Sequence, residues 1–330
     1  MRAIVTGGAG FIGSHLAEKL VKLKHKVIVI DNFSIGRKSN LKNIQNKIKI
    51  INQSILNEKE IEKYFKSVDN VFHLAAMADI VPSIENPKLY FDINVKGTLN
   101  ILNLSVKNKI KRFIYIASSS SYGIPKNYPT SENSKIDPQY PYALTKRLGE
   151  ELVMHYSKIY KLNSTSLRFF NVYGPRARTS GTYGAVFGVF LAQKIAGKPF
   201  TVVGNGKQTR DFTYVSDIVE SIISVSKNKK VSGEIFNVGS GKTVSVNKIV
   251  SILGGKKVFI PKRPGEPEIT FADISKIKKK IGWYPKVDIE EGVNKLLENL
   301  SNFKDAPLWT PKTIKKATRK WFLYLGAKKR

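Results

Sequence analysis

Short apolar runs and amphipathic runs follow one another through the first half of the chain. The apolar runs predict buried strands at residues 3–5, 26–30, 49–51, 68–74, 112–117 and 164–169. The amphipathic runs predict helices at residues 14–23, 94–107 and 142–160. This alternation is typical of a parallel sheet with helices on both faces, and it therefore predicts a doubly wound α/β fold.

The pattern changes after residue 171. Helical spacing returns at residues 187–196, but glycines and prolines interrupt most of the chain from 197 to 267. We expect a second, smaller α/β lobe over residues 171–304, with part of 205–245 returning to the first domain, residues 1–170. Residues 174–183, which are rich in arginine, glycine and hydroxyl groups, are expected to form a loop over the site.

The last segment, residues 305–330, has apolar positions near helical spacing with lysines between them. It opens with Thr310 and Pro311, which are typical of an N-cap and of the first helical position. We expect a basic amphipathic C-terminal helix that docks on the body of the protein. The alternative is a helix that lies on a membrane surface.

A glycine-rich loop connects the first predicted strand to the first helix. Its three spaced glycines are Gly7, Gly10 and Gly13. In this context they permit a tight turn, let the backbone approach a pyrophosphate, and let the helix pack closely on the strand. Asp31 ends the second strand, and an acid there accepts ribose hydroxyls and repels a 2′-phosphate. The sequence therefore predicts a Rossmann-type domain that binds NAD, with Arg37 and Lys38 keeping NADP as an alternative.

Composition narrows the function classes. The 330 residues are 42% hydrophobic, and no window reaches the ~18 uninterrupted apolar residues of a membrane span. The lack of cysteine excludes disulfides and thiol catalysis, and the four scattered histidines lack metal-ligand spacing, so we expect no metal. The first strand leaves no room for a signal peptide, so we expect a cytoplasmic protein.

The net charge of +31 would attract anionic partners. Most of the lysines fall on polar helix faces and in loops, and no nucleic-acid-binding motif accompanies them. We therefore favour a solvated basic surface over specific nucleic-acid binding.

Tyr142 and Lys146 lie four residues apart at the start of the long predicted helix, and so on one face of it. A lysine ammonium near a phenol favours the phenolate and lowers its pKa, which makes the tyrosine a general base. Four serines, residues 118–121, follow the fifth strand at the sheet edge where ligands of such folds bind. One of them can hydrogen-bond a substrate hydroxyl, but the residues alone do not select which.

Three arginines of the second half lie in loops flanked by glycine or proline: Arg176, Arg210 and Arg263. Because guanidinium groups pair well with phosphate oxygens, they suggest that the second lobe binds a pyrophosphate.

These motifs resemble those of the extended short-chain dehydrogenase/reductases, in the group of nucleotide-sugar epimerases and dehydratases. The matching stretches run from about residue 1 to 300 and include TGGAGFIGSHL, VFHLAAMADIVPSIENP, ASSSSYG, YPYALTKRLGE, RFFNVYGPR and GNGKQTRDFTYVSDIV. The resemblance implies a catalytic set of Ser118, Tyr142 and Lys146. It also implies a homodimer, through helices 94–107 and 142–160.

The resemblance extends the cofactor contacts beyond the glycines, Asp31, Tyr142 and Lys146. The additional residues are Phe11, Ile12, Asn32, Ser54, Ile55, Leu74, Ala75, Ala76 and Asn94. Ser54 stands where relatives carry an adenine-contacting aspartate, so affinity for the cofactor could be weaker.

The substrate contacts that the resemblance implies lie in both halves of the chain. They are Ser83, Ser118, Ser119, Tyr142, Asn171, Val203, Arg210, Arg263 and Thr270. Thr270 occupies a size-gating position, and its small side chain leaves room for an N-acetyl group.

The loop after the fifth strand separates the reactions within this group. Dehydratases place Asp-Glu, and decarboxylases a glutamate, where this chain has Ser119 and Ser120. Without those carboxylates elimination loses its acid/base pair. The resemblance therefore favours NAD-dependent 4-epimerisation of a UDP-hexose: UDP-glucose and UDP-galactose, with their N-acetyl forms as further candidates. The alternatives are dehydration, uronate decarboxylation or 4-keto reduction, and, from another class, a non-catalytic NAD-binding regulatory protein.

Overall fold

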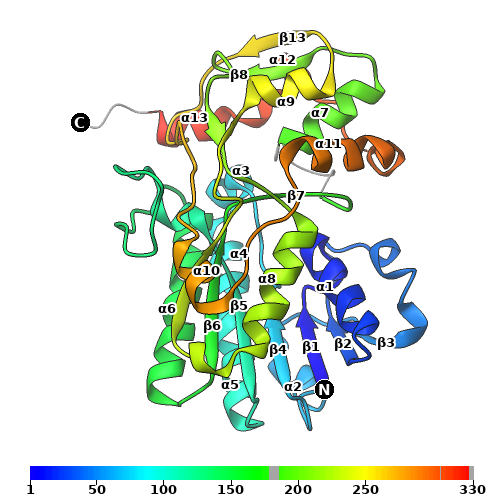
Figure 1. The fold of residues 1–330 in the computed structure, drawn as a ribbon, viewed down its shortest axis with the longest axis vertical. Helices are drawn as coiled ribbons and strands as arrows, with labels where there is room; N and C mark the ends of the chain where they lie inside the picture. Colours follow the sequence, from blue (N-terminus) through cyan, green and yellow to red (C-terminus); the bar gives the residue numbers. More distant parts are fainter. Residues whose placement is uncertain (178–185, 305, 327–330) are drawn as a thin grey trace.

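The computed structural model describes residues 1–177, 186–304 and 306–326, so most of the predicted loop at 174–183 lies outside the described residues. The larger part of the fold is a seven-stranded parallel sheet with the order β11-β6-β5-β4-β1-β2-β3 (Figure 1). Its strands are β1 (Arg2–Thr6), β2 (Lys26–Ile30), β3 (Ile48–Ile51), β4 (Asn70–His73), β5 (Arg112–Ser118), β6 (Ser164–Phe169) and β11 (Glu234–Val238). The doubly wound α/β fold is confirmed.

Helices cover both faces of this sheet. One face packs on α1 (Phe11–Lys22) and α8 (Val215–Lys227), through residues such as Leu16, Leu20, Ile218 and Ile222. The opposite face packs on α2 (Glu58–Glu62), α5 (Gly97–Lys107) and α6 (Pro141–Ile159), with a π-helical turn at Asp92–Lys96 leading into α5. Short helices α3 (Ile80–Glu85) and α4 (Pro87–Phe91) precede that turn. Helix α8 and strand β11 thus return from the second half of the sequence to the large sheet.

The second lobe lies above the carboxyl ends of these strands and has its own apolar core (Figure 1). Its helices are α7 (Val186–Ile195), α9 (Val246–Leu253) and α11 (Ile289–Glu298). Its strands pair as β8 (Phe200–Val203) with β13 (Lys257–Ile260), and β9 (Thr209–Arg210) with β12 (Val244–Ser245). Strands β7 (Asn171–Tyr173) and β10 (Phe212–Tyr214) pair where the chain passes between the lobes, and α10 (Ser275–Ile281) packs beside β11.

The C-terminal segment forms two short helices rather than the single expected one: α12 (Pro311–Ala317) and α13 (Arg319–Leu325). Thr310 caps α12 through a capping box. The break falls at Thr318, whose hydroxyl donates to the Ile314 carbonyl at 2.9 Å. Ile314 and Trp321 are both buried against the body, while Leu323 and Tyr324 are exposed. The apolar stripe is therefore used within the protein, and membrane contact stays a prediction.

Each helix in the described part of the chain is too short or too polar to cross a membrane.

Candidate active site

The glycine loop forms a cradle that leaves no room for side chains. A Cβ atom at Gly7, where φ is +68°, would lie 2.7 Å from the Ala75 amide nitrogen. A Cβ at Gly13 would lie 2.2 Å from the Gly7 carbonyl oxygen. Gly10 caps α1, and among the described residues no side chain caps it, so the first N–H groups of the helix can bind an anion. This geometry fits the pyrophosphate of a dinucleotide.

Asp31 lies at the end of β2, beside this cradle. Its carboxylate accepts hydrogen bonds from the amides of Ala9 (2.9 Å) and Phe33 (2.8 Å). Burial raises the pKa of Asp31, and the two amide hydrogen bonds lower it. A Cβ at Gly36 would lie 2.8 Å from both carboxylate oxygens, so the loop packs directly on the acid. The carboxylate is therefore held in a fixed position where a ribose could meet it.

The remaining predicted cofactor residues are spread around the same sheet edge. Phe11 and Ile12 line the central cavity, and Leu74, Ala75 and Ala76 follow β4. Asn94 is buried and binds both the amide and the carbonyl of Met77, so it fixes the segment after β4. Three further predicted residues, Asn32, Ser54 and Ile55, follow β2 and β3.

Ser118 and Tyr142 face each other across the cavity floor. Ser118 ends β5 and its hydroxyl lies 2.8 Å from that of Ser120. Burial raises the pKa of Tyr142, and a hydrogen bond with Ser118 opposes the shift. Tyr140, the N-cap of α6, stacks parallel to Tyr142 with ring centroids 6.4 Å apart. The sequence expectation of a lowered Tyr142 pKa is thus not met in the free protein, because desolvation outweighs the hydrogen bond.

The Lys146 side chain is buried against β5. Its ammonium donates to the Ile116 carbonyl and lies 4.5 Å from the centroid of the Tyr115 ring. Burial lowers the pKa of Lys146 to about 7, and the charge of Glu150, one turn further along α6, opposes this.

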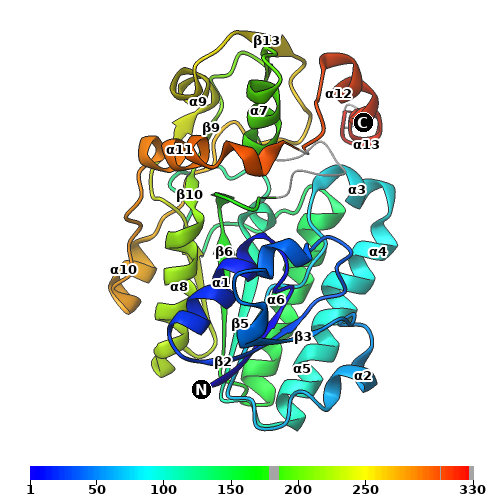
Figure 2. The same ribbon diagram turned by 90° about the vertical axis from the view of Figure 1, so that its right-hand side faces the viewer.

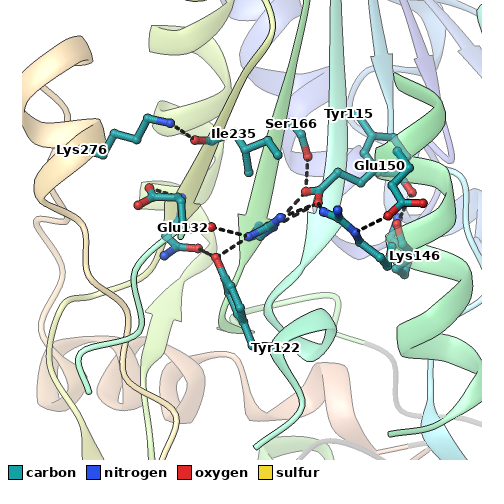
Figure 3. A network of polar contacts seen from close by, with 12 residues as sticks. Tyr115, Tyr122, Glu132, Lys146, Glu150, Ser166, Ile235 and Lys276 are labelled. Atoms are coloured by element: carbon teal, nitrogen blue, oxygen red, sulfur yellow. Dashed lines mark hydrogen bonds and ion pairs between the residues drawn. The ribbon is translucent and has the colours of Figure 1, made fainter. Parts of the chain in front are cut away.

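Glu150 belongs to a buried polar network that sequence reasoning missed (Figure 3). Its carboxylate pairs with Arg168 on β6 at 2.7 Å and accepts from Ser166 at 2.8 Å. Arg168 also donates a hydrogen bond to the Tyr122 hydroxyl, and that hydroxyl donates to the side-chain oxygen of Asn237 on β11. The network therefore joins α6, two sheet strands and the loop after β5 (Figure 3).

A cavity of about 510 Å³ separates the two lobes above these groups. It is lined from below by Ser118, Ser119 and Tyr142, and from above by Asn171, Val203, Arg210, Arg263 and Thr270. Ser83, by contrast, is buried inside α3, where its hydroxyl donates to the Ile80 carbonyl at 2.6 Å. The structure thus brings all the predicted substrate residues to the cavity except Ser83.

Arg210 and Arg263 share the carboxylate of Glu266. Arg210 donates to Glu266 at 2.9 Å, and the Arg263 guanidinium lies 3.7 Å from the same carboxylate. The two arginines hold the pKa of Glu266 below its usual value against the effect of burial. Arg176 instead pairs with Glu18 on α1 at 2.7 Å and is not among the described residues that line the cavity.

Asp79 is a second residue that the sequence reasoning missed. It lines the cavity just before α3, in a left-handed conformation with φ of +78°. Its charge contributes to the raised pKa of Tyr142. The feature that draws attention to Asp79 is its positive φ, which is unusual for a non-glycine residue and can be seen only in the structure.

Trp321 of α13 also lines the cavity.

Among the described residues no group of three or more histidine or acidic side chains could hold a metal ion.

This fold and site are those of a dinucleotide-binding enzyme, with Ser118 and Tyr142 beneath a second lobe that brings two arginines to the cavity. Residues 4–296 match the family model described as GDP-mannose 4,6 dehydratase, so the chain belongs to this family of NAD-dependent nucleotide-sugar epimerases and dehydratases.

Relatives in this family are named for different reactions. The chain is 37% identical to a UDP-N-acetyl-alpha-D-glucosaminuronate decarboxylase of Bacillus cytotoxicus, over 90% of this chain and 97% of that one. It is 34% identical to the UDP-glucose 4-epimerase of Thermotoga maritima, solved with UDP-glucose (TM-score 0.86, 91% and 99% covered). The UDP-glucuronic acid 4-epimerase of Bacillus cereus, solved with UDP-glucuronic acid and NAD, is also 34% identical (TM-score 0.85, 91% and 99% covered).

Proposed function

We propose that this protein is an NAD-dependent 4-epimerase of a UDP-hexose. The observation that supports it best is the cavity floor, where Ser118 and Tyr142 meet and serines stand at positions 119 and 120. The substrate class comes from the arginine pair above that floor and from the UDP-sugars bound by the solved relatives.

Tyr142 would take the proton of the 4-hydroxyl, with Ser118 hydrogen-bonded to the same oxygen. When bound, NAD would supply reversible hydride transfer at C4 of the sugar, above the face that Ser118 and Tyr142 hold. Lys146 in its charged form would stabilise the phenolate of Tyr142 from the next turn of α6. Arg210 and Arg263 would hold the diphosphate while the 4-keto sugar turns over in the cavity.

The glycine cradle, the helix N-terminus and Asp31 would hold the cofactor as described above. Since hydride is returned in each cycle, NAD is regenerated and should remain bound.

Asp79 supports a second candidate. A carboxylate beside Tyr142 offers an additional acid/base group, which decarboxylation or dehydration needs and epimerisation does not. Epimerisation remains the better-supported reaction, because the acids at positions 119 and 120 are replaced by serine.

The homodimer stays a prediction. It would form through α5 and α6, and Leu144 and Ile159 of α6 are 48% and 53% exposed.

The test is to incubate the protein separately with UDP-galactose, UDP-GalNAc and UDP-glucuronate and to resolve the products by chromatography. We expect the 4-epimer of at least one sugar without added cofactor. Tyr142→Phe should nearly abolish turnover with an unchanged circular dichroism spectrum. Tyr140→Phe, which removes the hydroxyl of the stacked ring, is the matched control and should keep most of the activity. Formation of a pentose or a 4-keto-6-deoxy sugar, with no epimer, would overturn the proposal.

A further inference from the structure

The segment beyond the family match crosses from one lobe to the other. Helix α13 lies between the second lobe and α3 of the large domain (Figure 2). Lys320 pairs with Glu85 at the end of α3, at 3.7 Å. One residue later, the Trp321 indole donates to the Pro264 carbonyl of the second lobe at 2.8 Å. The tail therefore contacts both lobes within two successive residues.

Trp321 makes a direct contact with the predicted diphosphate site. The Arg263 guanidinium lies 5.4 Å from the centroid of its ring, and Trp321 is only 2% exposed. An aromatic face attracts a guanidinium without neutralising its charge. The Arg263 guanidinium also lies 3.7 Å from the carboxylate of Glu266, which pairs with Arg210, so Trp321 contacts one of the two cavity arginines directly.

We propose that Trp321 is a positioning residue of the diphosphate site, holding Arg263 in the orientation that binds a nucleoside diphosphate. The C-terminal segment is then part of the substrate site, although it lies outside the residues that define the family. This inference rests on the proposed function, because it requires that the cavity takes a nucleoside diphosphate.

The arrangement also explains why an indole suits this position. A carboxylate at position 321 would hold Arg263 as firmly but would offset the positive charge that a diphosphate needs. An aliphatic side chain would fill the space but would not orient the guanidinium plane. The indole fills the space and orients the guanidinium plane. Its N–H donates to the Pro264 carbonyl, which fixes the position of the ring.

The test is calorimetric titration of the full chain with UDP. Trp321→Leu should weaken UDP binding by about 5–30-fold, the range of a desolvated cation–π contact. Trp321→Phe keeps an aromatic face and should stay within about threefold of wild type. Leu323→Ala, on the same helix but 62% exposed, is the control and should bind UDP as wild type does. In an Arg263→Gln background, Trp321→Leu should cause less than a further twofold loss, since Trp321 acts through Arg263.

A second measurement leaves Trp321 unchanged and uses its fluorescence as the signal for UDP binding. Trp321 is the only tryptophan left when Trp283 and Trp309 are replaced by phenylalanine. UDP should then change its fluorescence saturably, at the concentrations that titrate binding in calorimetry.

The possible negative outcomes distinguish a failure of this inference from a failure of the proposed function. Unchanged UDP affinity in Trp321→Leu, or a silent Trp321 emission at saturating UDP, would overturn this inference alone. An equal loss in the Arg263→Gln background would show that Trp321 acts by supporting the fold and would also overturn it. A wild-type protein that binds no UDP would overturn both the inference and the proposed function.

Discussion

Replacing Glu150 by glutamine is expected to be strongly destabilising, although the substitution changes little in shape. The carboxylate and its partner Arg168 have side chains that are 1% and 2% exposed. Glu150 also accepts from Ser166 and pairs with Arg147, so its charge is compensated from three sides. Glutamine would leave the Arg168 cation buried with neutral partners.

Removing one partner of such a buried pair costs about 3–5 kcal/mol in the free energy of unfolding. With an unfolding entropy of roughly 0.7 kcal/mol/K for a chain of this length, the melting temperature should fall by about 4–7 °C. Calorimetry or circular dichroism in a thermal ramp measures this directly.

Glu151→Gln is the matched control. Glu151 is the next residue on α6 and also pairs with Arg147, at 2.9 Å, but its side chain is 53% exposed. Exposed pairs contribute about 0–1 kcal/mol, so its melting temperature should stay within about 1.5 °C of wild type. Equal shifts for the two variants would refute the assignment of the stability to the buried network.

Three further predictions follow from the site. Gly13→Ala should abolish NAD binding or destabilise the domain, since a Cβ would meet the Gly7 carbonyl at 2.2 Å; wild-type NAD affinity by calorimetry would contradict this. Asp79→Asn removes a negative charge that raises the pKa of Tyr142, so the limb of the pH–rate profile on which activity rises with pH should move to lower pH; a shift to higher pH would contradict it. Burial lowers the pKa of Lys146 to about 7 in the folded protein, against 10.5 for an exposed lysine. Between these two pH values the unfolded chain carries a proton on Lys146 that the folded protein has lost, so the free energy of unfolding should increase as pH rises. Lys146→Met should flatten this rise in the urea midpoint between pH 7 and 10; an unchanged slope would show that another group carries it.

The features that could be predicted from the sequence depend on neighbours in the chain. The glycine loop is recognisable because strand, turn and helix follow one another within twenty residues, and Asp31 because it ends the next strand. Tyr142 and Lys146 are one helical turn apart, so their common face required no tertiary information. The sheet edge then placed the serines after β5 beside them.

The features that could not be predicted depend on contacts between distant segments. The sequence predicted that part of residues 205–245 returns to the large domain, but the pairing of β11 with β6 at the edge of the sheet is visible only in the structure. Trp321 reads as one apolar position of an amphipathic helix, and only the packing of α13 shows that it faces Arg263. Asp79 was missed because nothing in its local pattern distinguishes it from a loop residue. The direction of the Lys146 side chain depends on the Ile116 carbonyl, which lies on another element.

The buried network also explains how the protonated form of a buried lysine is stabilised near the cavity. An isolated ammonium at the position of Lys146 would lose its proton readily, as its lowered pKa shows. Glu150 opposes that loss, but an unpaired buried glutamate would itself tend to protonate, so it needs Arg168. Arg168 in turn is oriented by Tyr122, which reaches β11 through Asn237. The charge of Lys146 is therefore supported by Glu150, and Glu150 is held in turn by a chain of contacts that runs through Arg168 and Tyr122 to Asn237 on β11.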